Sequence, residues 1–465
     1  MAKTPHIAIL PSPGMGHLIP MAEFAKRLAE HHHISATILI PTTGAPPQAQ
    51  ISVLESLPEN IHHLFLPPVD GVPQGVRPEI IISFIMKASH SSVQDAIRSL
   101  KANTNLVGLV FDMFGHDAIE VAKEFDLFKF LFFPMSAMAL SFTFILPKLD
   151  EESSCEYKDL PYLVHVPGSV SFHGKELMAP VQVRTDDVYK GYLLLSKRLS
   201  MFDGIMVNSF DELEEETFRV LRASVAGKTP IYSIGPLIQS VDNGSDRHEC
   251  LKWLDNQPNG SVVFVCFGSG GTLTLDQVHE LAHGLEMSNQ RFLWVVRSPS
   301  KASNANFFNA VSQDDPLGFL PKKFLANTVK KGLVVSSWAP QIEILSHEAT
   351  GGFLTHCGWN STLESVVHGV PMIAWPLYAE QHMNAKVMTE ALGLALKVET
   401  DDKGIITKEV IGKVVKELIE GDEGKKVSKR LEHLKGAAMK ALSNGGSSME
   451  SLSKFVQQLK KTSFL

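Results

Sequence analysis

Cysteine is scarce in this sequence of 465 residues, which contains four: Cys155, Cys250, Cys266 and Cys357. They form no CxxC pair and no regular framework, and this pattern excludes a disulfide-scaffold protein. Scattered thiols of this kind are typical of a reducing compartment. We therefore expect a cytoplasmic protein.

An excess of basic residues is also absent. The 43 Lys and Arg residues are outnumbered by 50 Asp and Glu residues, which gives a formal net charge of −7. Proteins that bind the nucleic-acid backbone carry basic patches, so we expect no nucleic acid as a partner. Any anionic ligand must then be held by local groups rather than by a broad positive field.

Long hydrophobic runs are missing as well. Pro134 and several Ser and Thr residues interrupt the most apolar stretch, residues 130–146, whereas a membrane span needs about 20 predominantly apolar residues. Prolines also interrupt the N-terminal segment before an apolar core of signal-peptide length can form. We expect no membrane span, and a buried strand over Phe128–Phe133 that leads into a core helix.

A strand–turn–helix design, by contrast, occurs twice. The apolar strand His6–Leu10 is followed by a glycine turn and a helix over 18–32. The strand Val262–Phe267 is followed by a second glycine turn and a helix over 275–286. Strands and helices alternate after each start, which predicts an α/β protein with parallel sheets covered by helices. Two starts indicate two Rossmann-like domains, joined by a Pro- and Gly-rich linker at residues 227–260.

Two further segments are polar. Ser298–Asp315 is long enough to form a surface lid or a disordered loop. The acidic run Glu212–Glu216 is typical of a solvated helix face. Both predictions rest on polarity alone.

A nicotinamide-dependent dehydrogenase is one alternative that a Rossmann-like turn suggests. The first turn, residues 14–16, lacks the third glycine of the dinucleotide motif. The next strand, Ala36–Ile40, ends in Pro-Thr-Thr instead of the acidic residue that would hold a ribose. Both departures argue against a dehydrogenase, and the turn instead places His17 at a helix N-terminus.

Residues 338–381 carry the most specific pattern in the chain. The strand Gly352–Thr355 runs into a turn, residues 356–361, that opens a predicted helix over Thr362–His368. A helix N-terminus presents backbone N–H groups and the positive end of the helix dipole, so it suits a phosphate. Trp338, at the head of the segment, offers a flat face to a base.

Polar side chains around this turn suit a nucleotide sugar. His356, Asn360 and Ser361 can add hydrogen-bond donors for phosphates. Glu364 lies one turn further along, where it can accept from sugar hydroxyls. The acid–amide pair at 380–381 combines acceptors and donors at another strand-to-helix junction.

Along their whole length, residues 338–381 resemble the signature of the plant secondary-product UDP-glycosyltransferases, which form carbohydrate-active family 1. The resemblance extends to the His17 turn, the Asp112 region and the FGSGG turn. Within the family it is closest to the hydroquinone (arbutin-forming) glucosyltransferase group, through stretches such as PSPGMGHLIP, CLKWLDNQP and QRFLWVVRSPS.

The resemblance implies the GT-B fold, in which two Rossmann-like parallel-sheet domains face each other across a cleft. Residues 1–237 would form the acceptor-binding domain, and residues 238–446 would form the UDP-sugar domain. A C-terminal helix at 447–465 would pack back on the first domain.

The resemblance also implies a role for individual residues. Trp338 would stack on uracil beside the backbone of Ala339, and Gln381, the last residue of the segment, is associated with glucose rather than galactose. The residues implied to bind the UDP-glucose donor are Gly16, Ser269, Trp338, Ala339, Gln341, His356, Trp359, Asn360, Ser361, Glu364, Glu380 and Gln381. The residues implied to line the acceptor site are Phe114, Ser136, Thr143 and Tyr378.

The implied chemistry needs a base and a stabilised leaving group. His17 would take the proton from the acceptor hydroxyl, with Asp112 as its orienting partner. His116 and Asp117 are competing candidates for the partner role. One displacement would invert the donor sugar into a β-O-glucoside on a small phenolic or indoxyl-like acceptor.

Neither a metal nor a cofactor is expected, because no DxD sequence occurs and UDP-glucose serves as the co-substrate. We expect a monomer. The alternative from another class is a non-catalytic UDP-sugar-binding protein, which would have no need of His17 and Asp112.

Overall fold

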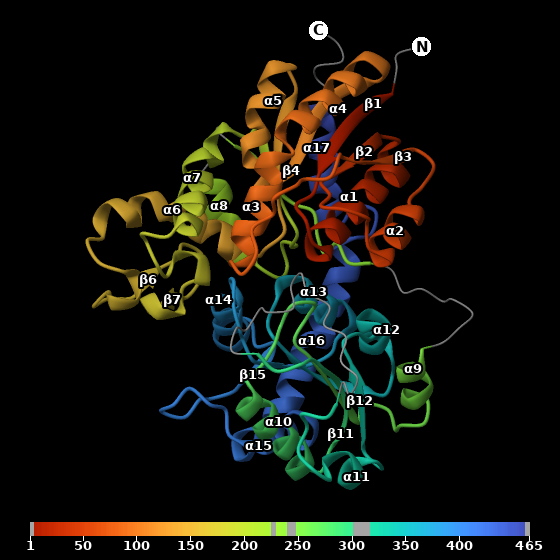
Figure 1. Cartoon of the computed structure of the whole chain (residues 1–465), viewed down its shortest axis with the longest axis vertical. Helices are drawn as coiled ribbons and strands as arrows, with labels where there is room; N and C mark the ends of the chain where they lie inside the picture. Colours follow the sequence, from red (N-terminus) through yellow and green to blue (C-terminus); the bar gives the residue numbers. More distant parts are fainter. Residues whose placement is uncertain (1–3, 225–228, 240–247, 301–316, 461–465) are drawn as a thin grey trace. The chain divides into compact units, whose positions relative to one another are not determined.

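The computed structural model describes residues 4–224, 229–239, 248–300 and 317–460 (Figure 1). Contacts divide the chain into two compact units. Unit 1 contains Met1–Lys175, Pro180–Gln239 and Ala438–Leu465, and unit 2 contains Glu176–Ala179 and Ser240–Ala437. Most of the polar stretch predicted to be a lid or loop, together with the middle of the predicted linker, lies outside the described residues.

In the described part of unit 1, seven strands form a sheet in which all neighbours are parallel. Their order across the sheet is β3 (Ile61–Phe65), β2 (Ser35–Ile40), β1 (Pro5–Leu10), β4 (Asn105–Asp112), β5 (Phe128–Phe133), β8 (Gly204–Val207) and β9 (Ile231–Ser233). Strands such as β1 are nearly continuous apolar runs, as expected where helices cover both faces of a parallel sheet.

The helices that connect these strands are α1 (Met15–His32), α2 (Gln48–Glu55), α3 (Pro78–Ala88), α4 (His90–Asn103), α5 (Ile119–Glu124), α6 (Ala137–Glu152), α7 (Asp187–Arg198) and α8 (Glu215–Ser224). The last helix of the chain, α17 (Ser447–Lys460), also belongs to unit 1. A short hairpin, β6 (Val164–His165) and β7 (Ser171–Phe172), lies between α6 and α7 in the chain.

Helix α1 begins at Met15, three residues before the predicted start. Gly14 precedes it with a φ of 117°, a value that residues with a side chain rarely adopt. The chain therefore turns from β1 into α1 within four residues, and His17 falls in the first turn of the helix.

Unit 2 has a second parallel sheet, for which the described residues supply six strands. The order is β12 (Gly332–Ser336), β11 (Arg291–Val296), β10 (Val262–Cys266), β13 (Thr350–Thr355), β14 (Met372–Ala374) and β15 (Ala395–Lys397). Its helices are α9 (Glu249–Leu254), α10 (Leu275–Ser288), α11 (Phe324–Thr328), α12 (Gln341–Ser346), α13 (Trp359–His368), α14 (Gln381–Lys386), α15 (Lys408–Glu420) and α16 (Asp422–Ala441). The predicted pair of Rossmann-like α/β domains is confirmed.

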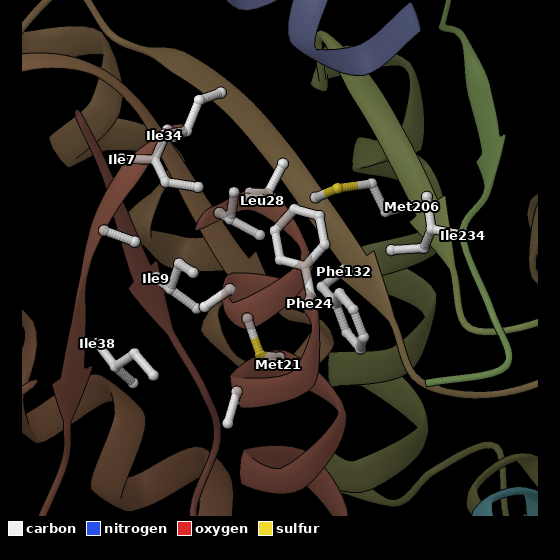
Figure 2. Close-up of a cluster of buried hydrophobic side chains, with 14 of the residues drawn as sticks. Ile7, Ile9, Met21, Phe24, Leu28, Ile34, Ile38, Phe132, Met206 and Ile234 are labelled. Carbon is white, nitrogen blue, oxygen red and sulfur yellow. The ribbon is translucent and has the colours of Figure 1, made fainter. Parts of the chain in front are cut away.

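The core of unit 1 lies between α1 and the sheet. Figure 2 shows Met21, Phe24 and Leu28 of α1 against Ile7 and Ile9 of β1, and all five side chains are fully buried. Burying one such side chain contributes about 1.5–3 kcal/mol, so this face of α1 fixes the helix on the sheet. The first turn of α1 is thereby held at the carboxyl end of β1.

Helix α17 joins the same core from the other end of the chain. The ring of Phe455 lies 5.7 Å from that of Phe24, 4.7 Å from that of Phe130 and 5.9 Å from that of Tyr232. Leu459 is fully buried beside them. The described part of the C-terminal helix therefore packs within unit 1.

The acidic run at 212–216 differs from its prediction. Glu214 is only 5% exposed, and its carboxylate accepts hydrogen bonds from the backbone N–H of Ala137 and Met138, at 2.8 and 2.9 Å, and from the Ser209 hydroxyl, at 2.6 Å. The prediction of a solvated face was wrong for this residue, because the N-terminus of α6 needs an acceptor that only the tertiary structure brings there. Burial raises the pKa of the Glu214 carboxyl.

No helix among the described residues is long and apolar enough to cross a membrane. The predicted strand Phe128–Phe133 is β5, and the helix that follows it, α6, is buried along one side as expected for a core helix.

Candidate active site

A histidine–aspartate pair lies at the carboxyl ends of two neighbouring strands of unit 1. Asp112 is the last residue of β4, and His17 follows β1, which pairs with β4. The His17 Nδ1 is 2.8 Å from the Asp112 Oδ2. The Asp112 side chain is fully buried and that of His17 is 16% exposed.

Asp112 is fixed by two further hydrogen bonds. Its Oδ1 accepts from the Ser12 hydroxyl at 2.6 Å and from the Phe114 N–H at 3.3 Å. Ser12, which is 2% exposed, was not predicted as a site residue. The sequence holds no signal for it beyond its place in the turn after β1, because its partner lies 100 residues away.

The competing candidates lie in a different set of contacts. The His116 Nδ1 is 2.7 Å from the Arg198 guanidinium, and Asp117 forms an ion pair with the same arginine at 2.5 Å. Burial lowers the pKa of His116 to about 4. His17 is therefore paired with Asp112, whereas Asp117 is paired with Arg198.

The predicted acceptor residues of unit 1 differ in their surroundings. Phe114 packs edge-on against the His17 ring, with centroids 5.8 Å apart and planes at 79°. Ser136 is 1% exposed and caps α6 by accepting from the Ala139 N–H at 3.2 Å. Thr143 is fully buried, donates to the Ala139 carbonyl at 2.7 Å and lies 2.6 Å from the Tyr192 hydroxyl. Phe114 is thus the predicted acceptor residue whose ring is observed against the histidine.

In unit 2 the most distinctive feature is the N-terminus of α13. The helix begins at Trp359, three residues before the predicted start, so Trp359, Asn360 and Ser361 form its first turn. Gly358 occupies the cap position and supplies no side-chain acceptor. Because first-turn N–H groups have no carbonyl within the helix, this end suits an anion.

His356 is held between two glycines beside that helix end. A Cβ atom at Gly268 or at Gly358 would lie 2.5 Å from its Nε2, so both positions require glycine. The residue is 8% exposed, and its Nδ1 has no hydrogen-bond partner within the described part of the chain. Burial, with a smaller contribution from Arg297, lowers the pKa of His356 to about 4, so the ring is neutral near pH 7.

Three predicted donor residues form one cluster. The Gln341 amide donates to the Ser361 hydroxyl at 2.8 Å and to the Glu364 carboxylate at 2.6 Å. Burial raises the pKa of Glu364 to about 7, although the Gln341 hydrogen bond acts in the opposite direction. The cluster places two side chains that can form hydrogen bonds with hydroxyl groups beside the N-terminal part of α13.

Trp338 is 64% exposed, the condition expected of a ring that stacks on a ligand. Its ring meets that of His248 edge-on, with centroids 5.7 Å apart. Ala339, next in the chain, is buried. Ser269 is exposed in the turn after β10, and Gly16 is the second residue of α1, in unit 1.

The acid–amide pair is positioned at the start of α14. The Gln381 side-chain oxygen accepts from the N–H groups of Leu377 and Tyr378, both at 2.9 Å, which leaves its amide group for a ligand. Glu380 accepts from the Asn384 amide at 3.2 Å. Asn384, not predicted as a site residue, also donates to the Cys357 carbonyl at 3.0 Å and so joins this loop to the turn before α13.

Among the residues that the structure describes, no group of three or more His, Cys, Asp or Glu side chains is arranged to hold a metal ion. The four cysteines are free thiols.

Two Rossmann-like units, one with a histidine–carboxylate pair and one with an anion-suited helix end, are the features of a nucleotide-sugar glycosyltransferase of the GT-B fold. The family model described as UDP-glucoronosyl and UDP-glucosyl transferase matches residues 239–442. The hydroquinone glucosyltransferase of Rauvolfia serpentina is 52% identical over 456 residues, which cover 97% of each chain. The chain therefore belongs to the UDP-glucoronosyl and UDP-glucosyl transferase family and is a UDP-glucosyltransferase.

Solved structures agree with this assignment. UGT2 of Phytolacca americana, in complex with UDP-2fluoro-glucose and pterostilbene, is 46% identical with a TM-score of 0.90, over 98% of this chain and 100% of that one. A UDP-glucosyltransferase from Polygonum tinctorium capable of glucosylating indoxyl, in complex with 3,4-dichloroaniline, is 47% identical with a TM-score of 0.90, over 99% and 100% of the two chains. The predicted family, its hydroquinone group and the GT-B fold are confirmed.

Proposed function

We propose that this enzyme transfers glucose from UDP-glucose to the hydroxyl of a small aromatic acceptor, with inversion, to form a β-O-glucoside. His17 is the base, and Asp112 is its orienting partner. The observation that carries the proposal is the 2.8 Å contact between His17 Nδ1 and a buried carboxylate that two other donors already fix. A fixed carboxylate selects the tautomer with hydrogen on Nδ1 and leaves Nε2 to accept a proton.

The reaction is one displacement at the anomeric carbon. A phenol has a pKa of about 10, so its proton moves to His17 Nε2 as the oxygen attacks. The glucose–phosphate bond breaks on the opposite side, and UDP leaves with the bonding electrons. Asp112 stabilises the imidazolium that forms.

UDP is held by the predicted residues of unit 2. In this proposal Trp338 stacks on uracil beside the Ala339 backbone, and Gln341 with Glu364 binds the ribose. The N-terminus of α13, His356 and Ser269 stabilise the charge that develops on the departing diphosphate. Neither a metal ion nor a cofactor takes part, and Glu380 and Gln381 bind the glucose hydroxyls.

The acceptor class is supported by the relatives. Their names and bound ligands include hydroquinone, indoxyl, pterostilbene and 3,4-dichloroaniline. All are aromatic, and the phenyl ring of Phe114 beside His17 suits such a ligand. Ser136, Thr143 and Tyr378 stay predictions as acceptor contacts, as do the monomeric state and the cytoplasmic location; the free thiols support a reducing compartment.

The experiment follows UDP release from UDP-glucose and hydroquinone, with and without EDTA, and measures the proton coupling constant at the anomeric carbon of the product. We expect turnover that EDTA does not change, and a β-glucoside. His17→Ala is expected to lower kcat by roughly 100-fold or more, with UDP affinity unchanged. His31→Ala, at the exposed end of the same helix, is the control, and its kcat and UDP affinity should equal those of the wild type.

Three results would contradict parts of this scheme. Absence of turnover with every phenol tested would refute the activity. Loss of activity in EDTA would refute the metal-free mechanism. A collapse of UDP affinity in the His17 variant would assign that residue a structural role.

A further inference from the structure

Arg297, to which the sequence analysis assigns no role, lies at the carboxyl edge of the unit 2 sheet. It follows β11, whose neighbours in the sheet are β12 and β10, and β10 is in turn paired with β13. Across the sheet, the turn after β12 carries Trp338, that after β11 carries Arg297, that after β10 carries Ser269 and that after β13 carries His356. In parallel sheets this is the edge at which ligands bind.

The Arg297 guanidinium connects two of those turns. Its Nε and Nη2 donate to the Ser337 carbonyl at 3.1 and 2.8 Å, and its Nη1 donates to the Gly268 carbonyl. Ser337 and Gly268 have φ values of 68° and 73°, both in the left-handed region. The arginine thus holds two unusual backbone turns, one next to Trp338 and the other next to Ser269.

The positive charge of Arg297 has no counter-charge among the residues that the structure describes. Among the described residues, no carboxylate forms an ion pair with it, although the side chain is half-buried. Arg184, Arg198 and Arg222, by contrast, each contact an aspartate. A partly desolvated guanidinium without an anion is costly, so its presence at a ligand-binding edge indicates an anionic ligand.

Two further observations connect this charge with the phosphate end of the site. Burial lowers the pKa of Arg297, and the groups that act on it electrostatically are a thiol and a phenol, Cys266 and Tyr378, rather than a carboxylate. The charge of Arg297 also contributes to the lowered pKa of His356. Its field therefore acts at the imidazole beside the N-terminus of α13.

We propose that Arg297 compensates the charge of the bound UDP diphosphate, and that its hydrogen bonds to Gly268 and Ser337 hold it in the position to do so. The inference rests on the proposed function of the same site. It explains how a chain with a net charge of −7 attracts a dianion: one uncompensated cation and one helix end act locally in a partly desolvated site.

The test separates charge from hydrogen bonding. Arg297→Gln removes the charge but keeps an amide that can donate to a carbonyl, whereas Arg297→Lys keeps the charge but loses the fork. Calorimetry with UDP and with uridine, which lacks phosphate, is done on the full-length chain. Arg291→Gln is the matched control, since it lies on the same strand roughly 20 Å away at the other end.

We expect the Gln variant to bind UDP at least about tenfold more weakly, while its uridine affinity changes by less than about threefold. The Lys variant should keep UDP affinity within about threefold of the wild type. Equal losses for UDP and uridine, or unchanged UDP affinity in the Gln variant, would overturn the inference. If the Gln variant does not fold, Arg297→Met, which also removes the charge, replaces it and is judged by the same criterion.

The wild-type measurement distinguishes this inference from the function on which it rests. A wild-type protein that binds no UDP refutes the proposed function itself. A wild-type protein that binds UDP and turns over, with an Arg297→Gln variant that matches it, refutes only the role of Arg297.

Discussion

Glu364 shows at the scale of one residue how burial changes the titration of a carboxyl group. Its pKa of about 7 lies above the ordinary value of 4.5, mainly because the charged form is desolvated. The folded state therefore binds a proton that the unfolded state has lost between pH 4.5 and 7. The contribution of this group to stability is fully present below about pH 4.5 and is lost as the pH rises through about 7.

Ligand affinity should have the opposite dependence. If the ionised carboxylate accepts hydrogen bonds from ribose hydroxyls, UDP-glucose binds more weakly as the pH falls from 8 to 6, by up to about tenfold per unit below pH 7. UDP-glucose is the ligand of choice for calorimetry because its diphosphate does not titrate in this range. Glu364→Gln should flatten the profile.

Glu348→Gln is the control for that profile, because Glu348 is exposed and lies two residues before the next strand. Its pH dependence should match the wild type. A wild-type affinity that stays constant from pH 6 to 8 would exclude Glu364 as a carboxylate acceptor for the ribose.

At the scale of elements, the helix ends decide where side chains go. The N-terminus of α13 is left without a side-chain cap and suits a ligand, whereas that of α6 is satisfied by Glu214 from another part of the chain. Ser136, predicted to contact the acceptor, acts in the structure as the cap of α6. One helix end thus lacks a side-chain cap, whereas the other is stabilised by a buried carboxylate.

Glu214→Ala is expected to destabilise the protein by about 2–4 kcal/mol, because the Ala137 and Met138 N–H groups would lose their acceptor while remaining buried. Urea unfolding followed by circular dichroism measures this change. Glu215→Ala alters the next residue, which is exposed, and should change stability by less than about 0.5 kcal/mol. Equal effects of the two substitutions would show that the buried hydrogen bonds contribute nothing specific.

At the scale of the molecule, the chain leaves unit 1 after Gln239 and returns to it at Ala438. The returning segment is part of the core, since Phe455 packs against rings from α1, β5 and β9. Unit 1 is therefore complete only when the last helix has been added. The residues that hold His17 in place include some from the far end of the sequence.

Phe455→Ala should lower the stability of unit 1 by about 3–5 kcal/mol, the usual result of removing a buried aromatic ring. The midpoint of activity loss in urea should fall with it, because His17 and Asp112 belong to the same unit. Lys454→Ala, at an exposed position on the same helix, should leave both midpoints unchanged. A Phe455 variant as stable as the wild type would show that unit 1 folds without α17.

The sequence by itself determined the local chemistry of this protein. Glycine turns after apolar strands, helical periodicity and the pattern at 338–381 depend on neighbouring residues, so they indicated two Rossmann-like domains and the helix end for a phosphate. The predicted starts of α1 and α13 lie three residues after the observed ones, because hydrophobic periodicity does not reveal the cap geometry at Gly14 and Gly358.

Only the tertiary structure decided which side chains meet. His17 contacts Asp112, 95 residues away, and not Asp117, because β1 and β4 are neighbours in the sheet while Asp117 turns toward Arg198. Ser12, Asn384 and Arg297 likewise join the site through partners elsewhere in the sequence, at separations of 100 residues for Ser12, 27 for Asn384, and 29 and 40 for Arg297. Strand order brings such residues together, and it is fixed by packing over the whole unit rather than by any local pattern of residues.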